Sequence, residues 1–254
     1  MQSSPFALLD GLIAPAPATR RVAFLTVRPF AHRGLHGPDV AENSRAAFAA
    51  AIAAGHGIEC DVRASRDGEA FVFHDETLDR LTGETGPVAE RTAAALAGIR
   101  LQNDGETLLR LSEMLALVAG RVPILIELKA PGVQVAPLCL AVRRVLEGYR
   151  GAVAVMSLNP RVGRWFAEHA ERITRGLVVT EEGRRGLCGR AARHIALWRA
   201  RPDFLAYDVR DLPSRFAAAT RARGVPVLAW TVRDAAAERT AFAQADQIIY
   251  EEPA

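Results

Sequence analysis

The sequence predicts an α/β protein with the fold of a single distorted TIM-like (β/α)8 barrel. Three observations lead to this prediction. Short apolar runs rich in β-branched residues alternate along the chain with alanine-rich helical segments. Some runs, such as Ile124-Leu125-Ile126, are apolar without a break, which is typical of parallel strands buried on both faces. The chain has 254 residues, 50% of them hydrophobic, which suits one α/β barrel domain.

Nine strand candidates follow one another, one more than a (β/α)8 barrel uses. The connection from Asp61 to Phe71 is too short for a crossover helix and contains the turn signal Asp67-Gly68. We therefore expect either a distorted barrel or one strand outside it. The candidates are a short strand before His32 and the runs 57–63, 70–74, 124–128, 152–158, 176–179, 204–208, 225–232 and 246–250.

Helices separate several of these runs and begin at recognisable capping residues. Asn43 or Ser44 is predicted to cap a helix that ends at Gly55. Asn159 stands before a proline at the first helical position of another. Further helices are predicted after Asp234 and over residues 90–97 and 112–119.

Residues 1–21 are predicted to form an extended N-terminal arm, and residues 22–254 the barrel domain. The alternating prolines Pro15 and Pro17 cannot continue a helix, which is the basis for the arm. The first twelve residues lack the cationic start and apolar core of a signal peptide, and no run reaches the roughly 18 apolar residues of a membrane span. We expect no membrane span and a cytoplasmic location.

The cysteine count and the charge of the chain limit the kinds of site and partner that it can have. The three cysteines, Cys60, Cys139 and Cys188, are odd in number and widely spaced, which argues against a disulfide scaffold or a zinc site. The formal charge is +3, and no Lys/Arg run is interleaved with aromatic residues. We therefore expect no nucleic acid and a small anionic partner, bound by a monomer or a homodimer.

Carboxylates stand at the ends of two predicted strands. Glu59 and Asp61 are two residues apart, so the period of a strand places them on one face. Glu127 ends a second apolar run. Three carboxylates converging at the carboxyl ends of parallel strands would form an oxygen-rich site for one divalent cation, Mg²⁺ or Ca²⁺.

Basic groups accompany these carboxylates. Lys129, the only lysine in a chain otherwise supplied with arginine, follows Glu127 directly and offers a compact charge to a phosphate and metal site. Arg33 lies between His32 and Gly34, where glycine permits a tight backbone and arginine can bind a phosphate bidentately. His32 and His74 together offer a general acid and a general base for cleavage of a P–O bond.

Trp230 ends the apolar run 225–229. A tryptophan there is either a core residue or a wall of the substrate site at the active end of a barrel strand. Sequence alone leaves both interpretations open.

In its ordered motifs the chain resembles the glycerophosphodiester phosphodiesterases, which are phospholipase-C-like phosphodiesterase barrels. The resemblance spans most of the chain. The motifs that carry it are His32-Arg33-Gly34, Glu42-Asn43-Ser44, Ile58-Glu59-Cys60-Asp61-Val62, Asp67-Gly68, His74-Asp75-Glu76-Thr77-Leu78-Asp79-Arg80, Ile126-Glu127-Leu128-Lys129 and Trp230-Thr231-Val232.

The resemblance implies metal-dependent hydrolysis of a small glycerophosphodiester to sn-glycerol 3-phosphate and an alcohol. It implies the following roles: His32 and His74 as general acid and base, Glu59, Asp61 and Glu127 as metal ligands, and Arg33, Lys129, Trp230 and Glu42 as phosphate or substrate-binding residues.

The chain departs from the family pattern mainly at its end, where Tyr250-Glu251-Glu252-Pro253 replaces the usual Thr-Asp-x-Pro. Ala41 also stands where proline usually precedes Glu-Asn. These changes affect the expected substrate and leave the reaction class unchanged.

Three other functions remain compatible with the sequence. One is action on lysophospholipid head groups. Another is a metal-dependent barrel isomerase or aldolase that uses Lys129 as base or Schiff-base former. The last is a non-catalytic phosphoester-binding barrel.

Overall fold

The structure is a computed structural model that describes residues 6–103 and 105–252. The chain divides into two compact units, which are described separately. Unit 1 contains the residues up to Pro29 and the segment Ala154–Tyr250, and unit 2 contains Phe30–Val153 and the residues from Glu251 onward.

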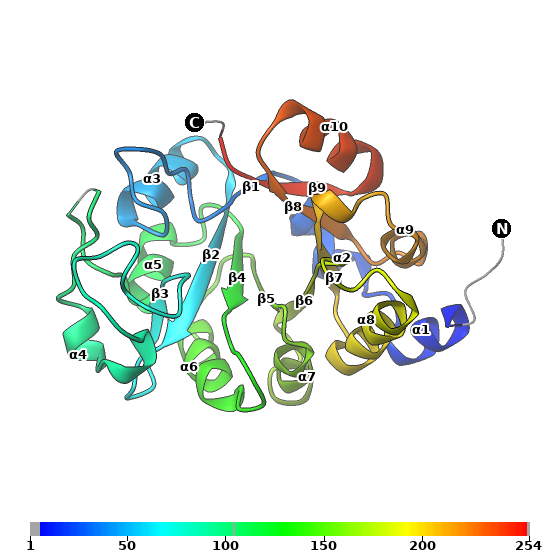
Figure 1. Ribbon diagram of the computed structural model, residues 1–254, viewed down its shortest axis with the longest axis horizontal. Coiled ribbons are helices and arrows are strands. Elements are labelled where there is room, and N and C mark those ends of the chain that lie inside the picture. The colour runs from blue at the N-terminus through cyan, green and yellow to red at the C-terminus, as the bar shows by residue number, and fades with distance from the viewer. Residues whose placement is uncertain (1–5, 104, 253–254) are drawn as a thin grey trace. The chain divides into compact units, whose positions relative to one another are not determined.

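Unit 2 is built on three parallel strands. β1 (Phe30–Ala31) pairs with β2 (Gly57–Ala64), and β2 pairs with β4 (Ile124–Leu128). Figure 1 shows β2 and β4 side by side. β3 (Ala70–Val72) runs antiparallel to β2, because only a tight turn joins them. It is therefore the extra strand that the sequence predicted.

Helices follow the strands of unit 2. Ser44 caps α3 (Arg45–Ala53) by accepting a hydrogen bond from the backbone N–H of Ala47, as predicted. The connection from β3 to β4 holds α4 (Ala93–Leu96) and α5 (Leu111–Val118), and α6 (Ala136–Leu146) follows β4. A 3₁₀ turn, η2 (Val88–Glu90), precedes α4.

An apolar cluster fixes the first part of that connection. Phe71 and Phe73 are almost fully buried and pack with Leu78 and Leu96. Because burial of such side chains stabilises a segment by about 1.5–3 kcal/mol each, residues 74–82 are held firmly beside β2 and β3. These residues carry groups of the candidate site.

Unit 1 contains five parallel strands paired in chain order. They are β5 (Val153–Ser157), β6 (Thr174–Val179), β7 (Phe204–Asp208), β8 (Val227–Val232) and β9 (Gln247–Tyr250). The helices between them are α7 (Pro160–His169), α8 (Leu187–Ala200), α9 (Arg215–Ala222) and α10 (Ala235–Gln244), with a 3₁₀ turn, η3 (Val209–Asp211), after β7. Asn159 and Asp234 cap α7 and α10, as predicted.

The N-terminal segment is helical rather than extended. α1 (Ala7–Ile13), α2 (Thr19–Val22) and the 3₁₀ turn η1 (Ala23–Thr26) occupy most of its described part. The prediction of an extended arm over residues 1–21 was therefore wrong over residues 7–13 and 19–21, although Pro15 and Pro17 do lie outside any helix. Residues 1–5 lie outside the described part.

A buried carboxylate joins α1 to the rest of unit 1. Asp10 contacts Nδ1 of His194 at 2.9 Å, Nε1 of Trp198 at 2.8 Å and Nη1 of Arg223 at 3.1 Å.

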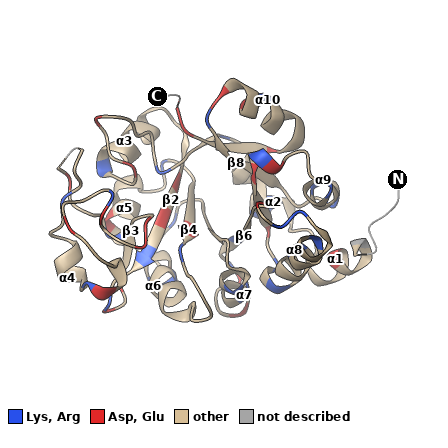
Figure 2. Cartoon of the chain, in the orientation of Figure 1, with Lys and Arg blue, Asp and Glu red and all other residues tan. Residues whose placement is uncertain are grey.

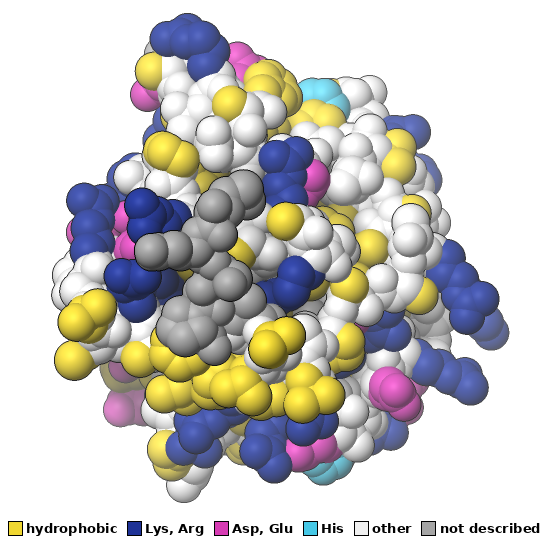
Figure 3. Space-filling view, turned by 90° about the vertical axis from the view of Figure 1, so that its right-hand side faces the viewer, with side chains coloured by type: hydrophobic (Ala, Val, Ile, Leu, Met, Phe, Trp, Pro, Cys, Tyr) yellow, Lys and Arg dark blue, Asp and Glu magenta, His cyan; other side chains and the backbone are white. Residues whose placement is uncertain are grey.

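The outer side of α1 exposes Leu8 and Leu12. On the face seen in Figure 3, basic side chains are scattered among hydrophobic and acidic ones.

The element order confirms the predicted α/β class. The described residues contain eight strands with parallel neighbours, three in unit 2 and five in unit 1, with helices between most of them. This is the alternation of a TIM-like (β/α)8 fold, with β3 outside the parallel set. No helix in the described ranges is long and apolar enough to cross a membrane.

Candidate active site

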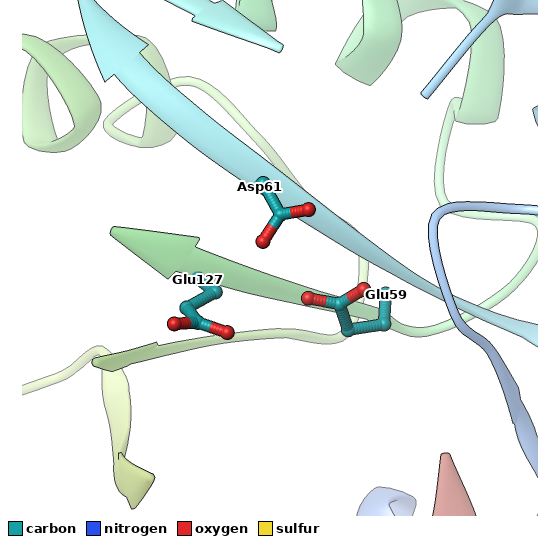
Figure 4. Close-up of side chains that lie close together, drawn as sticks. All are labelled: Glu59, Asp61 and Glu127. Carbon is teal, nitrogen blue, oxygen red and sulfur yellow. The ribbon is translucent and has the colours of Figure 1, made fainter. Parts of the chain in front are cut away.

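Three carboxylates from neighbouring strands meet in unit 2. Glu59 and Asp61 lie on one face of β2, and Asp61 stands in register with Glu127 on β4. Each residue has a ligand oxygen within 4.8 Å of the others. Figure 4 shows the three side chains pointing toward one another, and Figure 2 shows the acidic colour on β2. The convergence predicted from the two strand ends is confirmed.

Two cations flank this carboxylate cluster. Lys129 places Nζ 3.0 Å from Asp61 Oδ1 and 2.9 Å from Glu127 Oε1. Arg33 places Nε 3.1 Å from Asp61 Oδ2. Three carboxylates thus face two permanent cations, which leaves the cluster short of positive charge.

The pKa values show the effect of this imbalance. Burial raises the pKa of Glu59 well above its ordinary value, and the charges of Asp61 and Glu127 raise it further. Burial also acts to raise the pKa of Asp61, but Lys129 and Arg33 outweigh it and lower that pKa. Burial lowers the pKa of Lys129, yet Asp61 and Glu127 raise it overall and keep the amine charged.

The donor set fits a hard divalent cation. Glu59 Oε1 is buried and accepts no hydrogen bond from the described residues. Oxygen-only ligation of this kind suits Mg²⁺ or Ca²⁺ rather than zinc. A cation bound to these oxygens would supply the charge that the cluster lacks.

A tight loop after β1 presents His32 and Arg33 to the carboxylates. Arg33 has a φ of 57° and Gly34 a φ of 79°, both in the left-handed region. This turn lets the backbone N–H of Arg33 donate to Glu59 Oε2 at 3.1 Å. A Cβ at position 34 would lie 2.8 Å from the backbone of Ala47 in α3, so the position requires glycine.

Each catalytic histidine candidate is paired with a carboxylate through Nδ1. His32 Nδ1 lies 2.5 Å from Glu251 Oε1, and His74 Nδ1 lies 2.6 Å from Asp75 Oδ1. An ionised carboxylate only accepts, so this pairing places a proton on Nδ1 and leaves Nε2 for transfer to or from a substrate. Burial lowers the pKa of His74. His32 Nε2 is 3.9 Å from Glu59 Oε2.

The site thus combines a buried carboxylate cluster, two cations and two oriented histidines, and the sequence comparison agrees with this combination. Residues 32–254 match the glycerophosphoryl diester phosphodiesterase family. The chain belongs to this family. It is therefore a phosphodiesterase, a phosphoric diester hydrolase.

Individual relatives support the assignment to the glycerophosphoryl diester phosphodiesterases. The glycerophosphodiester phosphodiesterase of Caldanaerobacter subterraneus subsp. tengcongensis is 30% identical over 238 residues, which cover 88% of this chain and 93% of that protein.

Solved structures show the same fold. A glycerophosphodiester phosphodiesterase from Thermotoga maritima superposes with a TM-score of 0.70 at 24% identity, over 87% of this chain and 92% of the other. An Oleispira antarctica phosphodiesterase, solved in complex with the product sn-glycerol-3-phosphate, gives 0.75 at 22% identity, over 89% and 93%. The TIM-like barrel fold is thereby confirmed over most of the phosphodiesterase chain.

Two of the sequence-predicted site residues form hydrogen bonds with partners other than the three carboxylates. Glu42 accepts a hydrogen bond from Arg33 Nη1 at 2.7 Å, so it contacts the phosphate-binding candidate rather than the cluster. Trp230 lies in unit 1, where its indole N–H donates to the carbonyl of Ala206 at 2.9 Å. Its part in substrate binding stays a prediction.

Four site residues escaped the sequence analysis in their structural roles. Of the two alternative caps of α3, Ser44 takes that role. The Asn43 amide instead donates to Asp61 Oδ2 at 3.2 Å, and its Oδ1 accepts from the Asp61 backbone N–H. Asp75 and Arg80 lie in the motif that begins at His74, but the sequence assigns them no role. Glu251 lies where the chain departs from the family pattern. Asn43, Asp75 and Arg80 lie inside the family motifs, and this position was the signal that could have identified them. The long-range contact of Glu251 with His32 had no such signal.

Proposed function

We propose that the enzyme hydrolyses glycerophosphodiesters to sn-glycerol 3-phosphate and an alcohol, with His32 and His74 as general acid and base. One observation carries this proposal. Both histidines, each held at Nδ1 by a carboxylate, belong to the unit that contains the buried cluster of Glu59, Asp61 and Glu127.

The three carboxylates would hold one divalent cation, Mg²⁺ or Ca²⁺. When bound, it would neutralise charge that develops on the phosphoryl oxygens. Arg33 and Lys129 would bind and orient the same phosphate, the first by its guanidinium and the second by its point charge.

The histidines carry the proton transfers. One Nε2 accepts a proton from the attacking water or hydroxyl group, and the other donates a proton to the leaving oxygen. The nucleophile is either water or the neighbouring glycerol hydroxyl. A cyclic phosphate trapped by rapid quenching identifies the hydroxyl route, and its absence together with direct glycerol 3-phosphate formation identifies water.

A panel of substrates tests the proposed reaction. Purified protein is incubated with glycerophosphocholine, glycerophosphoethanolamine, glycerophosphoglycerol and a lysophospholipid, and glycerol 3-phosphate is measured enzymatically. We expect release from the water-soluble diesters and loss of release after chelation. Turnover of the lysophospholipid alone, or of none of the substrates under any cation, would contradict the proposal.

The ion pairs of Lys129 disfavour the aldolase alternative. A Schiff-base lysine reacts as a neutral amine, usually in an apolar or cationic environment. Lys129 instead contacts two carboxylates within 3.0 Å. Borohydride is therefore expected to trap no substrate adduct on this lysine.

A further inference from the structure

We propose that Arg80 is a positioning residue that holds His74 and Arg33 at the same time, through Asp75 and Glu42. The inference rests on the proposed function, because it assigns a task within that site. No step of the reaction requires Arg80 to touch the substrate.

The guanidinium of Arg80 binds two carboxylates at once. Its Nε donates to Asp75 Oδ2 at 2.6 Å and its Nη2 to Asp75 Oδ1 at 3.1 Å. On its other edge, Nη1 donates to Glu42 Oε2 at 3.0 Å and Nη2 to Glu42 Oε1 at 2.8 Å. Only the planar fork of arginine presents donors along two edges in this way.

Each bound carboxylate in turn holds a group of the site. Asp75 Oδ1 pairs with Nδ1 of His74 at 2.6 Å, and Glu42 Oε1 accepts from Nη1 of Arg33 at 2.7 Å. Arg80 therefore links His74, a proton-transfer candidate in the segment after β3, with Arg33, a phosphate-binding candidate in the loop after β1. Loss of Arg80 would free both carboxylates to rotate.

The backbone around Arg80 is fixed independently of these contacts. Leu78 is fully buried in the apolar cluster with Phe71, and its carbonyl accepts a hydrogen bond from the buried hydroxyl of Thr82 at 2.8 Å. Arg80 lies between these two anchors. Its guanidinium thus starts from a firmly placed Cα, which a positioning role requires.

A purely stabilising surface ion pair is the competing interpretation. The side chain of Arg80 is 48% exposed, and ion pairs at that exposure add little stability. The Arg80 contacts differ from an ordinary surface pair because both acceptors are themselves shielded, at 11% and 22% exposure, and bind site residues. The two interpretations predict different measurements.

The chain offers a matched control. Arg91 lies in the same connection, pairs with Glu84 at 3.4 Å and is 40% exposed, but contacts no residue of the site. Arg80→Met, Arg80→Lys and Arg91→Met are compared with wild type as full-length proteins. Thermal unfolding is expected to change only modestly in all three.

The first readout is the ring of His74 in the metal-free protein. Long-range ¹H–¹⁵N spectra, assigned with His74→Gln, report which ring nitrogen carries the proton. We expect a protonated Nδ1 in wild type and Arg91→Met, and a mixture of tautomers in Arg80→Met. Unchanged His74 signals in Arg80→Met would overturn the inference. This readout needs no turnover, so it decides the role of Arg80 even if the proposed reaction is wrong.

The second readout is kinetic. Arg80→Met is expected to lower kcat roughly 10- to 100-fold, as supporting residues of metal sites commonly do. Arg80→Lys should recover only part of this loss, and Arg91→Met should lose nothing. Because Arg80 acts on His74 through Asp75 and on Arg33 through Glu42, Arg80→Met should add almost no loss of kcat in an Asp75→Ala/Glu42→Ala background. Wild-type kcat in both Arg80 variants, or additive losses in the Asp75→Ala/Glu42→Ala background, would overturn the inference.

Discussion

One histidine of the site is oriented by a carboxylate next to it in the sequence, and the other by a carboxylate far along the chain. His74 uses its neighbour Asp75, whereas His32 uses Glu251, 219 residues away. Both pairs use Nδ1, which leaves each Nε2 for proton transfer. The ring nitrogen that each histidine leaves open is therefore set by its carboxylate partner rather than by residue type alone.

Removal of either histidine should stop proton transfer but spare the cation site. We expect His32→Ala and His74→Ala each to lower kcat roughly 10²- to 10⁴-fold, the usual contribution of general acid–base catalysis. Calorimetric titration with Mn²⁺ should give wild-type binding in both. His169→Ala on α7 is the control. Near-normal turnover in both variants would rule out the assignment.

Acid should weaken the contribution of the Arg80 contacts to stability. Burial alone raises the pKa of Asp75, but hydrogen bonds from Arg80 and His74 outweigh it and hold that pKa at about 2. The unfolded chain therefore takes up this proton first, and the stabilisation present above about pH 4 is lost as pH falls toward 2.

Urea unfolding at several pH values measures this effect. The free-energy difference between wild type and Arg80→Met should be largest near neutral pH and should shrink below about pH 4. The difference is expected to be small because the Arg80 side chain is 48% exposed. A difference that grows as pH falls would contradict the proposed origin of the shift.

Strand register and one tight loop assemble the site from separate elements. The pairing of Asp61 with Glu127 follows from the parallel register of β2 and β4. The period of two and the polar strand ends were enough to predict that the three carboxylates converge. The contacts of Arg80 and Glu251 could not be predicted, because they depend on the path of loops after β1, β3 and β9 rather than on any local periodicity.

Gly34 should tolerate no side chain. In Gly34→Ala the Cβ meets Ala47 in α3 at 2.8 Å, and the φ of 79° disfavours alanine. We expect a loss of about 2 kcal/mol or more in the free energy of unfolding, with reduced kcat because His32 and Arg33 shift. Gly37→Ala is the control, since nothing lies within 4 Å of its Cβ position. Equal stability of the two variants in urea unfolding would count against this explanation.

The helix α1 could not be predicted from the local sequence. Pro15 and Pro17 do exclude a helix at their own positions, but they say nothing about the residues before them. The helix depends on Asp10, whose partners in α8 and after α9 are far away in sequence. A helix of seven residues is too short to be stable by itself, so its formation depends on these tertiary contacts, which the local sequence does not reveal.

Asp10 should therefore contribute strongly to the stability of unit 1. Asp10→Ala leaves the half-buried cation Arg223 without its carboxylate, which costs about 3 kcal/mol when a buried pair is broken. Thermal unfolding should show a clear decrease in Tm, whereas exposed Asp39→Ala should behave as wild type. An unchanged Tm for Asp10→Ala would mean that α1 is not anchored by this carboxylate.

Across the whole chain, the fold was more predictable than the site's supporting contacts. Alternating apolar runs identify the strands, because parallel strands are buried on both faces wherever they occur. All nine strand candidates are present, and within residues 6–103 and 105–252 only β3 stands outside the parallel set. The family match over residues 32–254 agrees with the motifs that run from His32 to Val232.

The central claim is that Glu59, Asp61 and Glu127 bind the cation on which diester hydrolysis depends. The most direct test measures glycerol 3-phosphate release against cation concentration, after chelation, in wild type, Glu59→Gln and the surface control Glu168→Gln. We predict saturable reactivation by Mg²⁺ or Ca²⁺ in wild type and Glu168→Gln, and none in Glu59→Gln. Full turnover by the chelated protein, or wild-type reactivation of Glu59→Gln, would contradict the claim.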